Sequence, residues 1–167
     1  ARADFVDDHV INVGDRAIEA RQRIGAGLSL MLHDRALMDW VERATGTGPL
    51  RALAGQLAET RANGSDELTW HDDLQDPNRL LAVVINLSEQ PFSGGSFELR
   101  RKQTTQPHLV FDHDRPGSML IFAVRPDLEH RVTPVTAGGP RRVFAGWFLS
   151  RPEHETGSLA SEIGRTV

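Results

Sequence analysis

Residues 80–87, with the sequence LLAVVINL, are the main indication of the fold class of this chain. They form an almost unbroken apolar run that is rich in Val, Ile and Leu. Such a run is typical of a strand that is covered on both faces. Residues 119–124, MLIFAV, have the same character. Together the two runs predict a barrel or sandwich of strands on which helices pack.

Short apolar segments of this kind continue from about residue 53 to residue 150, separated by Asn-Gly, Gly-Gly and Pro-containing breaks. This texture is typical of all-β proteins, and after a helical start it predicts a double sheet of the jelly-roll type. The pair Asn63-Gly64 predicts a hairpin between the first two strands. We expect strands over residues 53–61, 67–72, 80–88, 96–101, 108–112, 118–124, 130–135 and 141–149.

The first fifty or so residues are predicted to be mostly helical. Apolar residues recur at helical spacing between Leu37 and Ala44, and Gly46 follows as a stop signal. The segment 24–32 alternates like a strand but also forms a helical face, and we expect a helix there. We expect one domain over residues 1–167, with a helical support region at 1–52, a β core at 53–150 and a C-terminal tail at 151–167.

The composition excludes several classes of protein. The 167 residues are 39% hydrophobic and 25% charged, and no run reaches the roughly 18 apolar residues that a membrane helix needs. The formal net charge of -4 provides no positive field to attract a nucleic acid backbone. The chain has no cysteine, so a bound metal must take histidine and carboxylate ligands. No signal segment opens the sequence, and we expect a cytoplasmic location.

The motif His71-Asp72-Asp73, at the end of a predicted strand, is the first candidate for chemistry. Side chains alternate along a strand, so His71 and Asp73 are expected to share one face while Asp72 points away. A second histidine, His130, opens a later predicted strand. Two histidines and one carboxylate can form the facial triad of a non-haem Fe(II) centre. The triplet is weak evidence when taken alone, because the chain has 7 histidines and 23 acidic residues.

Arg141 adds a fixed cation to this candidate site. By the period of two, Arg141 shares one face of the last predicted strand with Trp147, and we expect that face to point toward the same interior as His130. A buried guanidinium can hold a carboxylate through two hydrogen bonds. The strand therefore predicts an anion site near the metal ligands.

The other histidines are expected to have no chemical role. His108 and His113 flank a predicted strand, and Asp112 and Asp114 make this segment look rich in ligands. The segment lacks a histidine and a carboxylate two residues apart, so we expect no second metal site there. Trp70, which faces away from the metal ligands, is expected to pack between helix and sheet.

Six short segments follow one another in an informative order: WHDD (70–73), RLLAVVINLSE (79–89), FSGGSFEL (92–99), RPGSMLIF (115–122), EHRVTPVTAGGPRR (129–142) and VFAGWF (143–148). They provide a His-x-Asp pair, a hydrophobic strand, a Gly-Gly turn, a Pro-Gly turn into a strand, and a distal histidine followed by an arginine six residues before a tryptophan. In this order the segments resemble the prolyl 4-hydroxylase-like branch of the Fe(II)- and 2-oxoglutarate-dependent oxygenases. The resemblance covers roughly residues 53–150.

This resemblance implies a distorted double-stranded β-helix of the jelly-roll or cupin-like class. It implies that His71, Asp73 and His130 are the iron ligands and that Arg141 binds the distal carboxylate of 2-oxoglutarate. Arg142 stays the alternative, because the turn through residues 138–140 can shift the register. The implied enzyme consumes O2, with ascorbate as an optional reductant, and converts 2-oxoglutarate to succinate. It hydroxylates an unactivated C–H bond of an amino acid, a prolyl peptide or a small metabolite.

The chain departs from the family in having no tyrosine. Arg61 and Asn86 occupy two positions where relatives often carry one. An amide can donate a hydrogen bond in place of a phenol, so Asn86 is expected to bind the cosubstrate beside Arg141. Arg61 is expected either to recognise an anionic group on the substrate or to be a solvated arginine of the hairpin.

Two other classes of function stay open at this point. A zinc-dependent hydrolase uses the same kinds of ligand, but it gives Arg141 no role. A non-catalytic β-sandwich binding module would leave the metal ligands idle. The expected partner is a small-molecule or peptide substrate, with no nucleic acid and no membrane, and the oligomeric state is left open.

Overall fold

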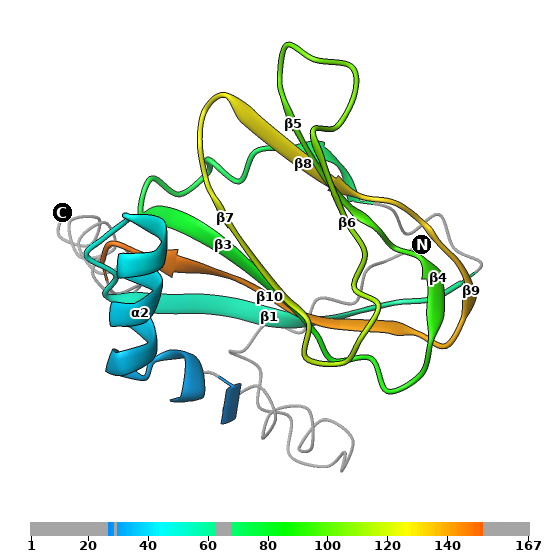
Figure 1. Cartoon of the computed structure of the whole chain (residues 1–167), viewed down its shortest axis with the longest axis horizontal. Coiled ribbons are helices and arrows are strands. Elements are labelled where there is room, and N and C mark those ends of the chain that lie inside the picture. Colours follow the sequence, from blue (N-terminus) through cyan, green and yellow to red (C-terminus); the bar gives the residue numbers. More distant parts are fainter. Residues whose placement is uncertain (1–26, 29, 63–67, 152–167) are drawn as a thin grey trace, which may run out of the picture.

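The computed structural model describes residues 27–28, 30–62 and 68–151, and these are mostly strands. Two four-stranded antiparallel sheets pack face to face, and a two-stranded sheet lies at one end (Figure 1). The strands are β1 (Ala52–Thr60), β2 (Leu68–His71), β3 (Arg79–Asn86), β4 (Phe92–Gly94), β5 (Phe97–Arg101), β6 (Leu109–Phe111), β7 (Met119–Ala123), β8 (Leu128–Val132), β9 (Val135–Gly138) and β10 (Arg141–Leu149). The architecture is that of a double-stranded β-helix, as the sequence predicts.

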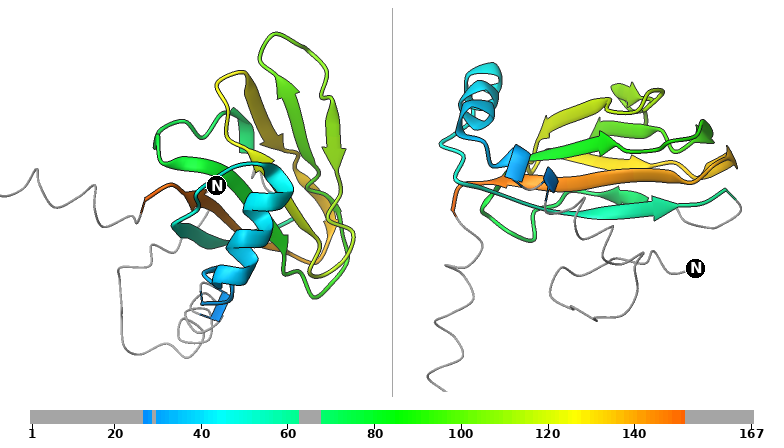
Figure 2. Two further views of the ribbon diagram at one scale, coloured as in Figure 1. Left: turned by 60° about the vertical axis from the view of Figure 1, so that its left-hand side comes forward. Right: turned by 90° about the horizontal axis from the view of Figure 1, so that it is seen from below.

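β10 is an inner strand of the first sheet, whose order is β1-β10-β3-β7. It pairs along its whole length with β1, from Leu149 opposite Ala52 to Arg141 opposite Thr60, and on its other side with β3. The second sheet has the order β2-β8-β5-β6, and the small third sheet pairs β4 with β9. Figure 2 shows these layers from two further directions. Most neighbours within a sheet are distant in sequence, because the chain passes repeatedly from one sheet to the other.

Helix α2 (Arg35–Thr45) begins and ends with side-chain and backbone caps. The Leu37 N–H donates to Oδ1 of Asp34 at 3.0 Å, and Gly46 closes the helix in the left-handed conformation. Oε1 of Glu42 on α2 accepts a hydrogen bond at 2.8 Å from the N–H of Leu50, which fixes the segment leading into β1. The predicted helix over this region is confirmed, and residues 27, 28 and 30–32 before it are helical too.

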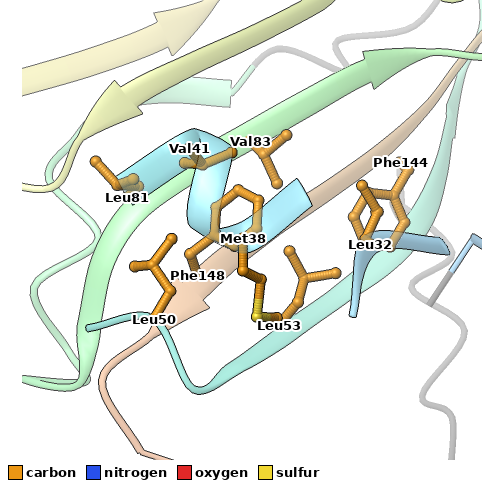
Figure 3. Packing of buried hydrophobic residues seen from close by; sticks show 9 residues of the cluster. All are labelled: Leu32, Met38, Val41, Leu50, Leu53, Leu81, Val83, Phe144 and Phe148. Atoms are coloured by element: carbon orange, nitrogen blue, oxygen red, sulfur yellow. The ribbon is translucent and has the colours of Figure 1, made fainter. Parts of the chain in front are cut away.

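The outer face of the first sheet packs against α2 (Figure 3). Met38 and Val41 of the helix meet the aromatic rings of β10 on this face. The buried members of this cluster are Leu32, Met38, Val41, Leu50, Leu53, Leu81, Val83, Phe144 and Phe148. Their burial supplies much of the hydrophobic stabilisation of the domain.

A second core fills the space between the two sheets. Ala82 and Phe122 from the first sheet pack against Phe97 and Leu99 from the second. β3 therefore contributes to both cores, since Ala82 faces the inner one while Leu81 on the same strand faces the helix. The prediction that residues 80–87 form a strand covered on both faces is confirmed.

The sequence misses some connections between strands. The sequence does not predict the short strands β4 and β9. The single strand expected over residues 130–135 is interrupted, because β8 ends at Val132 and β9 begins at Val135. The hairpin expected at Asn63-Gly64 is wrong because β1 and β2 lie in different sheets, although these two residues lie outside the described ones. The expectations for residues 1–26 and 152–167 also fall outside the described residues. No described helix has both the length and the hydropathy needed to cross a membrane.

The packing of α2 on β10 gives a test of this core. Phe148 is 1% exposed, so Phe148→Ala should lower the free energy of unfolding by about 3 to 5 kcal/mol, through lost burial and an unfilled cavity. Trp40 on the same helix is 52% exposed, and Trp40→Ala should change stability by about 0.5 kcal/mol or less. Urea unfolding followed by circular dichroism measures both values. Equal losses in the two variants would contradict this packing.

Candidate metal centre

Two histidines face each other across neighbouring strands of the second sheet. His71 is the last residue of β2 and lies directly opposite His130 in β8. Their ring centroids are 4.1 Å apart. His130 is buried, with the rings of Phe97 and Phe122 at centroid distances of 5.5 and 4.8 Å. These aromatic walls restrict the orientation of the His130 ring.

Asp73 reaches the histidines through a turn. β2 ends at His71, and the Asp73 backbone has a φ of 60°, in the left-handed region that residues other than glycine rarely adopt. Its Oδ1 lies 3.5 Å from Nε2 of His71, and its Oδ2 lies 3.5 Å from Nε2 of His130. The three side chains that the sequence singles out thus converge, although the pleat of a strand is not the cause. Strained backbone of this kind is concentrated at functional sites.

The three side chains form a compact set of metal donors. One donor atom from each lies within 4.8 Å of the others, and no second such group occurs among the residues that the structure describes. Two donors bound to one ion at about 2.1 Å and at a right angle are about 3 Å apart, so spacings of 3.5 Å need only a small contraction. Two imidazole nitrogens and one carboxylate fit Fe(II) or zinc.

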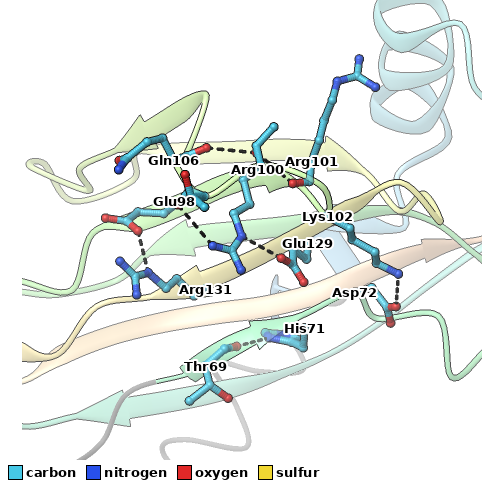
Figure 4. Close-up of polar contacts among 12 residues, drawn as sticks. Thr69, His71, Asp72, Glu98, Arg100, Arg101, Lys102, Gln106, Glu129 and Arg131 are labelled. Carbon is cyan, nitrogen blue, oxygen red and sulfur yellow. Dashed lines mark hydrogen bonds and ion pairs between the residues drawn. The ribbon is translucent and has the colours of Figure 1, made fainter.

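Both histidines present a nitrogen suited to metal binding. Nδ1 of His71 lies 2.7 Å from the carbonyl oxygen of Thr69, so it carries the hydrogen and leaves the lone pair on Nε2 (Figure 4). Burial, and then the nearby charge of His71, lowers the pKa of His130 to about 4. His130 is therefore neutral near pH 7, as a metal ligand must be.

Two further side chains orient the carboxylate of Asp73. Trp147 of β10 donates its Nε1–H to Oδ2 at 2.9 Å. Arg79, the first residue of β3, holds its guanidinium 3.7 Å from the centroid of the Trp147 ring and 4.0 Å from Oδ1 of Asp73. Such contacts fix the direction of a ligand's lone pairs. From the sequence, Trp147 is only a marker for the position of Arg141, and nothing in the pattern singles out Arg79.

The outer face of the second sheet carries a separate polar network. Asp72 points away from the site, as predicted, and its Oδ2 pairs with Nζ of Lys102 at 2.6 Å (Figure 4). This hydrogen bond lowers the pKa of Asp72. Trp70 lies under the guanidinium groups of Arg100 and Arg131, at 3.8 and 4.8 Å. The expectation that Trp70 packs between helix and sheet is therefore wrong, because its face of the sheet is covered by arginines.

Arg141 is a buried cation on the inner face of β10. It is 5% exposed, its Nε has no hydrogen-bond partner, and none of the described acidic side chains pairs with it. Burial lowers its pKa to about 10, so it keeps its charge at neutral pH. A Cβ at Gly95 would lie 2.7 Å from Cδ of Arg141, and Gly95 has a φ of 66°. The Gly-Gly turn thus leaves room for this arginine.

Arg142 and Arg61 lie away from this interior. Arg142 alternates to the other face of β10, and its Nε donates to Oε2 of Glu59 at 2.8 Å. The guanidinium of Arg61 pairs with Oε1 of the same Glu59 at 2.7 Å, and 73% of the Arg61 side chain is exposed. Of the two roles expected for Arg61, the solvated one agrees with this position.

Asn86 faces the inner side of the first sheet, as expected, but its amide is already committed. Its Nδ2 donates to the carbonyl oxygens of His113 and Arg115, both at 3.0 Å, and its Oδ1 accepts from the Ser88 N–H at 2.9 Å. No amide hydrogen is left for a cosubstrate. These hydrogen bonds argue against the expected role of Asn86 as a cosubstrate donor, and they hold the turn between β6 and β7.

His113 lies in that turn and is only 3% exposed. Burial, and then the charge of Arg141, lowers its pKa to about 4. From the sequence, His113 is expected to have no chemical role, because its segment lacks a histidine and a carboxylate two residues apart.

The contact between Trp147 and Asp73 leads to a prediction about metal affinity. Trp147→Phe keeps most of the ring but removes the Nε1–H, and it should weaken binding of Mn(II) by about 10- to 100-fold. Trp70→Phe, on the outer face, should leave the affinity unchanged. Calorimetric titration of both variants checks this, and a parental affinity in Trp147→Phe would show that Asp73 does not need the indole.

The buried histidines predict how stability varies with pH. His113 and His130 bind protons at about pH 4 when folded, against the ordinary 6.5, so between these values the unfolded chain binds more protons. The free energy of unfolding of the metal-free protein should therefore fall as the pH is lowered from 6.5 toward 4. Urea unfolding across this range measures it. A flat profile would mean that neither ring is buried in its neutral form.

Both the sequence and the structure of this chain are similar to those of known proteins. The family model of the 2OG-Fe(II) oxygenase superfamily matches residues 55–149. An oxidoreductase of the 2OG-Fe(II) oxygenase family from Burkholderia pseudomallei has a similar structure, with a TM-score of 0.62, 20% identity, and coverage of 90% of this chain and 65% of its own. No match is found among curated proteins.

Two hydroxylases share the fold at lower coverage of their own length. A prolyl hydroxylase from Trichoplax adhaerens, in complex with a hypoxia inducible factor oxygen degradation domain peptide fragment, gives a TM-score of 0.56 at 18% identity, over 84% of this chain and 60% of its own. A prolyl 4-hydroxylase structure from Phytophthora capsici gives 0.59 at 18% identity, over 84% of this chain and 47% of its own. This chain thus spans less than two thirds of each of these three proteins. The family match, which covers more than half of the sequence and includes the His-Asp-His cluster and Arg141, shows that the chain belongs to the 2OG-Fe(II) oxygenase superfamily.

Proposed function

We propose that this chain is the catalytic core of a dioxygenase that hydroxylates an unactivated C–H bond. In the overall reaction the substrate, O2 and 2-oxoglutarate give the hydroxylated substrate, succinate and carbon dioxide. One observation carries this proposal. The interior between the two sheets holds both a set of metal donors and a buried cation. The donors are two histidines and one carboxylate, and the cation is Arg141, which has no ionic partner among the described residues.

The metal ligands in this proposal are His71, Asp73 and His130. Three protein donors leave further positions on the ion for the cosubstrate and for oxygen. When bound, Fe(II) and 2-oxoglutarate together supply the activation of O2 and the two electrons that come from decarboxylation. The protein holds the carboxylate of Asp73 through Trp147, and the rings around His130 keep water away from one side of the centre.

Arg141 is proposed to bind the distal carboxylate of 2-oxoglutarate. A buried cation without a partner is unfavourable, and a carboxylate that forms two hydrogen bonds with it relieves this cost. Arg142 is a poor alternative since Glu59 already neutralises it on the other face of β10. A zinc-dependent hydrolase or an idle binding module would give Arg141 no such role.

The substrate is proposed to be an amino acid, a prolyl peptide or a small metabolite. The peptide in the Trichoplax complex makes a prolyl peptide the first class to test. Arg61 is no longer the preferred contact for a substrate because Glu59 pairs with it. The cytoplasmic location expected from the sequence stays a prediction.

Variants of the adjacent arginines test this function. Arg141→Ala should weaken binding of 2-oxoglutarate to the Mn(II)-loaded protein by about 2 to 3 kcal/mol, because it removes one partner of a buried charge pair. Arg142→Ala should have little effect on this affinity. Succinate formation that requires both Fe(II) and 2-oxoglutarate would support the reaction class. Turnover with zinc alone, or equal effects of the two arginine variants, would contradict the proposal.

A further inference from the structure

Two buried side-chain polar atoms in the described part of the chain have no hydrogen-bond partner. They are Nε of Arg141 and Nε2 of His113. A buried donor or acceptor without a partner is unfavourable, so native proteins contain few of them. That both belong to one region of the interior indicates that a ligand satisfies them together.

The ring of His113 cannot turn freely toward another partner. Its carbonyl oxygen is held by Nδ2 of Asn86, and its Nδ1 lies 3.2 Å from Oγ of Ser118. Phe111 packs against the ring at a centroid distance of 4.8 Å and an angle of 81°. The ring is therefore fixed from three sides, and Nε2 is the atom left to meet a ligand.

The side chains of His113 and Arg141 lie near each other on the inner side of the first sheet. The charge of Arg141 is the second largest cause, after burial, of the low pKa of His113, which places the two side chains within electrostatic reach of each other. Asn86, which anchors the backbone of His113, pairs in the sheet with Val143, two residues beyond Arg141 on the same face of β10. A hydroxyl can donate or accept, and we take the tautomer in which Oγ of Ser118 donates to Nδ1 of His113 and the ring hydrogen is on Nε2.

We propose that His113 is a second donor to the anion that Arg141 binds, and that its Nε2–H donates to the distal carboxylate of 2-oxoglutarate. This inference rests on the proposed function, in which Arg141 binds that carboxylate. His113 then donates the hydrogen bond to the cosubstrate that the sequence led us to expect from Asn86. Asn86 holds the backbone of His113 in place. A carboxylate has two oxygens with several acceptor sites, so it can accept from a guanidinium and an imidazole at once.

Two fixed donors also determine which 2-oxo acids bind well. The carboxylate must lie at one distance from the metal-binding end of the acid to reach both of them. His113 is therefore a specificity-determining residue that favours a 2-oxo acid with a second carboxylate. 2-Oxopentanoate has the same carbon chain as 2-oxoglutarate but lacks this carboxylate, so it serves as the reference ligand.

The test is calorimetric titration of the Mn(II)-loaded protein with each of the two acids. His113→Phe keeps an aromatic ring against Phe111 and should weaken 2-oxoglutarate binding by about tenfold, which corresponds to about 1.4 kcal/mol. It should leave the affinity for 2-oxopentanoate unchanged. His113→Gln restores a nitrogen donor at a similar reach and should recover part of the affinity. His108→Phe, at an exposed histidine on the same segment, is the matched control and should bind both acids like the parent.

A second measurement on the unmodified protein keeps the proposal testable if His113→Phe does not fold. Imidazole ¹H–¹⁵N spectra should show the Nε2–H of His113 shifting when 2-oxoglutarate binds but not when 2-oxopentanoate binds. An unshifted signal, unchanged 2-oxoglutarate affinity in His113→Phe, or an equal loss of affinity for both acids would each overturn the role of His113. If Arg141→Ala also leaves 2-oxoglutarate affinity unchanged, the proposed function itself fails, and the two failures are thereby distinguished.

Discussion

The alternation of side chains along β10 is the constraint on which the rest of the structure depends. Phe144 and Phe148 point to the outer face and pack in the core with α2, while Arg141 and Trp147 point inward. A slip of one residue would put the two aromatic rings into the interior and the arginine on the outer face, where Arg142 lies. Pairing with β1 on one side and β3 on the other prevents such a slip. The hydrophobic core and the site are therefore held in register by the same hydrogen bonds.

The site contains features that lower the stability of the protein. Asp73 has a left-handed backbone conformation, His130 is a buried imidazole, and Arg141 and His113 have buried atoms without a partner. Each of these features is unfavourable by about 1 to 3 kcal/mol. The two hydrophobic clusters, which cover β3 on both faces, offset these costs. Such compensation is common where a protein holds polar groups ready for a ligand.

The surfaces around the site are mostly neutralised by internal pairs. Glu59 accepts from both Arg61 and Arg142, and Arg131 pairs with Glu98 on the outer face of the second sheet. Ion pairs that are partly open to solvent, as these are, add little to stability. Their effect is to occupy arginines near the site, whereas Arg141, among the residues that the structure describes, is a buried guanidinium with no acidic partner.

The sequence by itself determined the class of secondary structure, most of the strands and helix α2. It also singled out four candidate site residues, which are His71, Asp73, His130 and Arg141. Apolar periodicity and the spacing of histidines, carboxylates and arginine are local properties, so they can be read from a single chain. Only the tertiary structure decided that β2 pairs with β8 rather than with β1, because hydrogen bonding between distant segments leaves no local pattern. It also decided that the amide of Asn86 is satisfied by backbone carbonyls and that Nε2 of His113 is buried without a partner. Which polar atom is satisfied and which is left for a ligand depends on contacts between residues 27 positions apart, and no sequence spacing reports them.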